Sequence, residues 1–69
     1  MISYSRLWHL LLDKKMKKTD LCEKAGISSS TLAKLGKGEM VSLDVLERIC
    51  EALNCDVGDI ISFREGDTL

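Results

Sequence analysis

The 69-residue sequence is 45% hydrophobic and 30% charged, a balance typical of a folded globular protein rather than a disordered one. A chain of this length has room for one domain, residues 1–69, with an expected core over about residues 5–63 and a frayed tail at 64–69. No apolar run reaches the roughly 18–20 residues of a membrane span, and the N-terminus lacks the pattern of a signal peptide. Three cysteines without secretory features predict free thiols and a cytoplasmic location.

The formal net charge of −1 conceals an asymmetry along the chain. Residues 1–40 contain eight basic and four acidic side chains, whereas residues 41–69 contain two basic and seven acidic ones. This polarity predicts one side of the molecule that faces phosphates, although an uneven scatter of solvated charges would give the same count.

The absence of proline and the spacing of the apolar residues predict an all-α, compact bundle of five short helices. The first is expected over residues 6–14 with Ser5 as its N-cap, and it should end before Lys15 enters the apolar face. That face is predicted to comprise Leu7, Trp8, Leu11 and Leu12.

The next two helices are expected over residues 18–25, ending at Gly26, and over residues 29–35 or 29–36, with Ser28 as N-cap. A fourth is expected over residues 43–53 behind Ser42, with Leu43 on its inner face. Asp56 and Asp59 are spaced as a capping box for a fifth at residues 57–61. The residues predicted to be buried together are Leu21, Ile27, Leu32, Leu35, Leu46, Ile49 and Leu53.

The second and third helices, with the short turn between them, form a predicted helix-turn-helix. Cys22 is small enough to allow a close helix crossing, Gly26 can adopt the positive φ of a sharp turn, and Ile27 fills the space beneath it. The outer face of the third helix has small polar residues and lysines and no acid, which suits the major groove of DNA. The predicted base-reading residues are Ser29, Ser30, Ala33 and Lys34. The predicted phosphate-binding residues are Lys17, Lys18, Thr19, Ser28 and Lys37.

The segment from Leu21 to Leu35 resembles the Cro/CI-type helix-turn-helix family, also called the xenobiotic-response-element family. The family pattern reads Leu-Ala-x-x-x-Gly-(Val/Ile)-Ser-x-x-Thr-(Ile/Leu)-x-x-(Leu/Ile), and the resemblance extends over about residues 7–61. It implies a lambda-repressor-like fold and double-stranded DNA binding in transcriptional regulation, as a repressor. Three departures from the pattern involve four positions: Cys22 replaces alanine, Glu39 replaces a basic residue, and Ser29 and Ser30 replace longer base readers.

In an alternative interpretation, the same helix-turn-helix fold serves as a protein-interaction module, such as an antitoxin or anti-repressor subunit. The net acidity and the small side chains of the third helix favour it. A further alternative is the DNA-reading part of a switch whose sensor lies in another chain.

The sequence predicts no enzyme, metal site, cofactor or small-molecule substrate. No nucleophile–base–orienter set can be assembled around His9, which is better explained as a solvated polar pair with Asp13. The cysteines lack Cys-x-x-Cys spacing. Because one such module contacts few bases, a homodimer is expected on two half-sites. Its predicted contacts are the apolar chain ends, which alternate as short strands that pair within or between chains: Ile2, Tyr4, Ile60, Ile61 and Phe63.

Overall fold

The computed structural model describes residues 2–63 as four α-helices and one 3₁₀ turn. The elements are α1 (Ser5–Asp13), α2 (Lys18–Ala25), α3 (Ser29–Gly36), α4 (Leu43–Leu53) and η1 (Val57–Asp59). The predicted bounds of α2, α3 and α4 are confirmed. The predicted tail at 64–69 lies outside the described residues.

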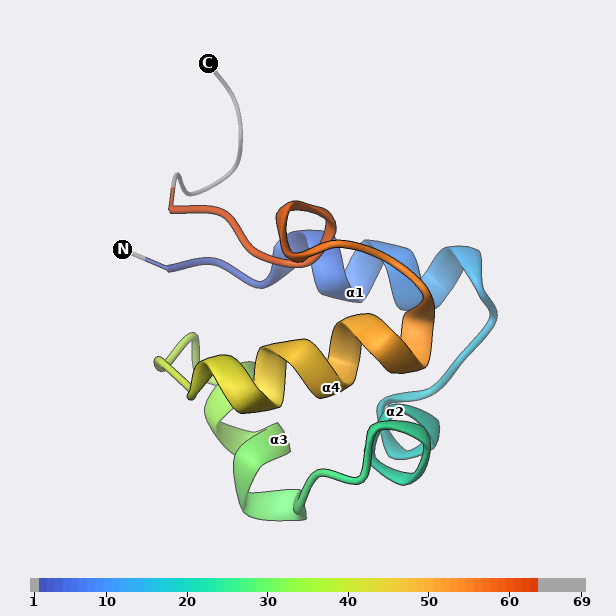
Figure 1. The fold of residues 1–69 in the computed structure, drawn as a ribbon, viewed down its shortest axis with the longest axis horizontal. Coiled ribbons are helices and arrows are strands. Elements are labelled where there is room, and N and C mark those ends of the chain that lie inside the picture. Colours follow the sequence, from blue (N-terminus) through green and yellow to red (C-terminus); the bar gives the residue numbers. More distant parts are fainter. Residues whose placement is uncertain (1, 64–69) are drawn as a thin grey trace.

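Helix α4 occupies the middle of the fold, with α1 on one side of it and α2 and α3 on the other (Figure 1). All four helices are short, so the core is built from one or two apolar positions per helical turn that converge between them. The buried residues are Tyr4, Leu7, Leu11, Leu21, Ala25, Leu35, Leu46, Ile49, Leu53 and Ile60. The predicted core is therefore confirmed at five positions, whereas Ile27 and Leu32 are only half-buried at its edge.

Helix α1 starts one residue earlier than predicted, and Ser5 is not its N-cap. Tyr4 holds that position without a side-chain cap, and the Ser3 hydroxyl accepts a hydrogen bond from the Ser5 amide at 3.3 Å. The prediction was wrong because the capping oxygen comes from a serine two residues further out. At its other end α1 stops before Lys15, as expected, and Lys15 adopts a left-handed φ of 57°.

Two leucines predicted to face inward are exposed instead. Leu12 is 74% exposed, although α1 packs against the core through the buried Leu7 and Leu11 and the half-buried Trp8 and Leu10. Leu43 is 80% exposed, because it is the first residue of α4 and precedes the turns that the other helices contact.

The chain ends pair within the molecule, through an isolated antiparallel bridge between Ser3 and Ser62. Their two backbone hydrogen bonds are 2.7 and 3.0 Å long. Tyr4 and Ile60 flank this bridge and are buried in the core, which corrects their prediction as contacts between chains.

The fifth element is a single 3₁₀ turn rather than a helix over 57–61. Asp56 and Asp59 form the predicted capping box, with the Asp56 amide donating to the Asp59 carboxylate at 3.0 Å. None of the described helices is both long enough and apolar enough to span a membrane.

Candidate nucleic-acid interface

Gly26 forms the turn between α2 and α3. Its φ of 69° and ψ of 35° lie in the left-handed region, where a side chain is strained, and its amide donates to the Cys22 carbonyl at 2.9 Å. The Ile27 amide donates to the same carbonyl at 3.1 Å. The chain therefore turns sharply within the three residues between α2 and α3, as the sequence predicted.

Arg48 on α4 ties this turn to the rest of the molecule, a role that the sequence did not reveal. Its guanidinium Nη1 donates to the Gly26 carbonyl at 3.2 Å, and its Nε lies 3.2 Å from the Asp44 carboxylate. A contact across 22 residues depends on how the helices cross, which the spacing of residues along one helix does not predict.

Ser28 caps α3 as predicted and is the centre of a hydroxyl cluster. Its Oγ accepts from the Thr31 amide at 3.2 Å and donates to Thr31 Oγ1 at 3.0 Å. Ser30 Oγ lies 3.0 Å from Ser28 Oγ, and it is the donor of that pair because Ser28 has one proton. This cluster holds the N-terminus of α3 in place, with its first amide groups directed outward for lack of intrahelical acceptors.

All four predicted base-reading residues are exposed on α3. They lie opposite Leu35, which is buried, and beside Leu32, which is half-buried. The exposed face has hydroxyl, methyl and ammonium groups and no carboxylate, so it offers donors to base edges and phosphates. The small side chains of Ser29, Ser30 and Ala33 let the helix backbone approach a groove closely.

The predicted phosphate-binding residues are exposed at both ends of the motif. Lys17, Lys18 and Thr19 lie at the start of α2, and Lys37 at the end of α3. The Lys17 amide donates to the Asp20 carboxylate at 2.9 Å, which caps α2. Lys18 Nζ lies 4.4 Å from the centre of the Trp8 ring, so the aromatic face holds this ammonium near the start of α2.

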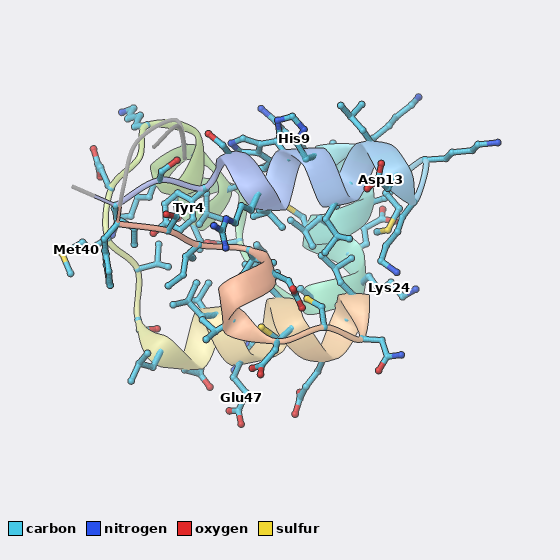
Figure 2. The ribbon with its side chains drawn as sticks, turned by 90° about the horizontal axis from the view of Figure 1, so that it is seen from above. Tyr4, His9, Asp13, Lys24, Met40 and Glu47 are labelled. Carbon is cyan, nitrogen blue, oxygen red and sulfur yellow. The ribbon has the colours of Figure 1, made fainter. Side chains whose placement is uncertain are left out.

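Acidic side chains occupy the outer face of α4 instead. Asp44, Glu47 and Glu51 are exposed there, and Glu47 points away from α1 and α2 (Figure 2). The asymmetry of the sequence is therefore also an asymmetry in space, with lysines around the helix-turn-helix and carboxylates on the outside of α4.

Cys50, near the end of α4, has Cys55 as a neighbour. No three metal-ligating side chains cluster within residues 2–63, and all three cysteines are free. Burial, followed by the neighbouring Cys55 and two aspartates, raises the pKa of Cys50 to about 11, and burial raises the pKa of Cys55. These thiols are therefore protonated at neutral pH and weakly nucleophilic.

These features define a helix-turn-helix DNA-binding domain. They are the Gly26 turn, the capped second helix with its acid-free outer face, and the lysines at both ends of the motif. Comparison with known families agrees: residues 6–66 match the model of the Cro/C1-type HTH DNA-binding domain. The chain belongs to this family, and its function is DNA binding in transcriptional regulation.

Two relatives illustrate the similarity. The crystal structure of the transcriptional regulator VanUg matches with a TM-score of 0.86 and 62% identity, covering 88% of this chain and 81% of that one. The uncharacterized HTH-type transcriptional regulator YozG of Bacillus subtilis (strain 168) is 40% identical over 60 residues, which are 84% of this chain and 71% of YozG.

Proposed function

We propose that the chain reads the sequence of double-stranded DNA with the N-terminal half of α3 and acts as a repressor. The observation that carries this proposal is the exposed, acid-free face of α3, held in place by the Gly26 turn and the Ser28 cap. A protein bound in this way over a promoter blocks transcription by occupancy alone. It needs no cofactor or catalytic step, and it works where the DNA is, in the cytoplasm.

The exposed residues divide into two roles. Lys34, Ser29, Ser30 and Ala33 face outward from α3 and are suited to base edges in the major groove. Lys17, Lys18, Thr19, Ser28 and Lys37 surround that face and are suited to phosphates. For Ser28 the contact runs through the helix N-terminus that it caps, because its own proton is donated to Thr31.

Ser30 has to change partner when it binds. Its hydroxyl is turned toward Ser28, so contact with a base requires rotation about one side-chain bond. The cost is one exposed hydrogen bond between hydroxyls, which is small compared with the roughly 1–3 kcal/mol that a matched base contact contributes. Because this cost is small, Ser30 can contribute to sequence preference together with Ser29 and Lys34.

Two copies of the chain are needed for tight binding. One α3 reads only a few base pairs, so we propose a homodimer on two half-sites about one helical turn apart.

Selection of bound sequences from a random duplex pool tests the proposal. The wild-type chain should enrich one preferred sequence. Lys34→Ala should change the base preferred at one position, by roughly 1–3 kcal/mol, whereas Lys18→Ala should weaken binding to all sequences alike and lower the salt slope by about one unit.

Lys24→Ala provides a charge-matched control, because Lys24 is exposed in the last turn of α2, outside both groups. It should keep the wild-type preference. If Lys34→Ala, Ser30→Ala and Lys18→Ala all bind duplex DNA as the wild type does at low salt, α3 is not the reading helix. The face would then serve a protein partner.

A further inference from the structure

Trp8 connects α1 to the start of α2. Its side chain is half-buried and packs against the edge of the core. The exposed Lys18 places its Nζ 4.4 Å from the centre of the Trp8 ring, so that the ammonium rests on an aromatic face. A helix outside the helix-turn-helix is thereby in contact with a residue suited to bind phosphate.

This contact lies at a shallow hollow where α1, the following loop and the start of α2 meet. The hollow has a volume of about 310 Å³, and its lining combines four apolar side chains with two lysines. The lining residues are Trp8, Leu11, Leu12, Met16, Lys17 and Lys18. Apolar neighbours displace water from the ammonium and the ring, which strengthens the attraction between them.

The ring holds Lys18 without neutralising it. Among residues 2–63 no carboxylate pairs with this ammonium, and the acid closest to it in sequence, Asp20, accepts a hydrogen bond from the Lys17 amide at 2.9 Å. A carboxylate would cancel the charge of Lys18 and compete with a phosphate for its N–H groups. An aromatic face attracts the ammonium through its π electrons and has no formal charge. The charge and the N–H donors of Lys18 therefore stay available to an anion.

We propose that Trp8 is a positioning residue for DNA binding, which holds Lys18 in the orientation that meets a backbone phosphate. This inference rests on the proposed function, in which Lys18 is a phosphate contact. A surface lysine loses rotamer freedom when it binds, and a lysine that already lies against a ring has less freedom to lose.

Loss of the ring should therefore weaken DNA binding by about two- to fivefold, the contribution of an exposed ammonium–ring contact. The loss should be the same for every DNA sequence, because a phosphate contact does not distinguish bases.

A double-mutant cycle, measured on the duplex selected from the random pool, tests the inference. Trp8→Leu removes the ring but keeps an apolar side chain against the core, and Lys18→Ala removes the ammonium. Trp8→Leu should weaken binding about two- to fivefold in the wild-type chain. It should have no further effect in the Lys18→Ala chain, because the ring then has no ammonium to position. A structural role of Trp8 alone predicts the same loss in both chains, and that result overturns the inference.

Trp8→Phe is the conservative control. Phenylalanine keeps an aromatic face under Lys18, so this variant should bind within about twofold of the wild type. Far-UV circular dichroism at the temperature of the binding assay shows whether each variant is folded. A folded Trp8→Phe chain that loses as much affinity as Trp8→Leu also overturns the inference.

Fluorescence tests the same point in the unaltered protein, because Trp8 is the only tryptophan of the chain. Acrylamide should quench Trp8 less when the selected duplex is bound, since the DNA backbone then covers the hollow. Unchanged quenching at saturating duplex overturns the inference even if Trp8→Leu does not fold. Failure of the proposed function gives a different result: the wild type binds no duplex at all, whereas failure of this inference leaves wild-type binding intact.

Discussion

At the scale of single residues, Lys15 is in an unfavourable conformation. Its φ of 57° lies in the left-handed region, which costs a residue with a Cβ roughly 1–2 kcal/mol, and it directly follows the C-cap of α1. Glycine is the usual residue at such a position, since it adopts this φ without strain.

Lys15→Gly should therefore raise the free energy of unfolding by about 0.5–1 kcal/mol, after the greater freedom of glycine in the unfolded chain is subtracted. The measurement is the midpoint of urea unfolding. Lys14→Gly is the matched control, because it removes the same charge from a residue whose φ is −90°. It should not stabilise the protein, and equal gains from both variants would attribute the effect to charge rather than to conformation.

Cys50 links stability to pH in the alkaline range. Burial is the main cause that raises its pKa from the ordinary value of 9.0 to about 11, with Cys55 second. Between these two values the unfolded chain has lost the thiol proton while the folded chain retains it, so the free energy of unfolding falls as pH rises from about 9 to 11.

Cys50→Ala should make this decline shallower. Urea unfolding at several pH values from 7 to 11 measures the difference between the variant and the wild type. That difference should be constant below pH 8 and should change in favour of the variant above pH 9. A constant difference throughout would contradict the raised pKa.

At the scale of elements, capping residues decided how well the helices could be predicted. Ser28 and Ser42 each accept a hydrogen bond from the amide three residues ahead, and α3 and α4 start directly after them. The left-handed Gly26 ends α2 in the same predictable way. The start of α1 was not predictable to the residue, because its cap comes from Ser3, outside the helix.

Ser28→Ala tests the cap of α3. The substitution removes the acceptor of the Thr31 amide and should cost about 1 kcal/mol of unfolding free energy. Ser29→Ala is its neighbour and control: no cap depends on it, so its effect should stay within about 0.5 kcal/mol. Thermal or urea unfolding of both variants provides the comparison, and equal effects would exclude Ser28 as the capping residue.

At the scale of the whole molecule, the contacts that hold the helix-turn-helix in place could not be predicted from the sequence. Periodicity was enough to predict which residues of α3 face outward. It could not predict that Arg48 reaches the Gly26 carbonyl or that Trp8 lies against Lys18, because both contacts depend on how the helices cross. Periodicity also failed to predict that Leu12 and Leu43 are exposed, because the apolar face of a helix does not show how far the neighbouring helices extend along it.

The uneven distribution of acidic and basic side chains is also a property of the whole molecule. A net charge of −1 argues against DNA binding only if acidic and basic side chains are mixed over the surface. Here Glu47 of α4 points away from α1 and α2 (Figure 2), and Asp44 and Glu51 are exposed on the same helix. The lysines around the helix-turn-helix can therefore approach phosphates, and binding should weaken as salt rises because counterions compete with these lysine–phosphate contacts.

The central claim is that α3 and the start of α2 contact DNA while α4 faces away, and amide chemical-shift mapping tests it most directly. A ¹⁵N-labelled chain is titrated at low salt with the duplex selected from the random pool. Shift changes should be concentrated at residues 17–19 and 28–37 and should be smallest on the acidic outer face of α4, including Asp44, Glu47 and Glu51. Changes centred on that acidic face, with residues 28–37 unaffected, would contradict the account.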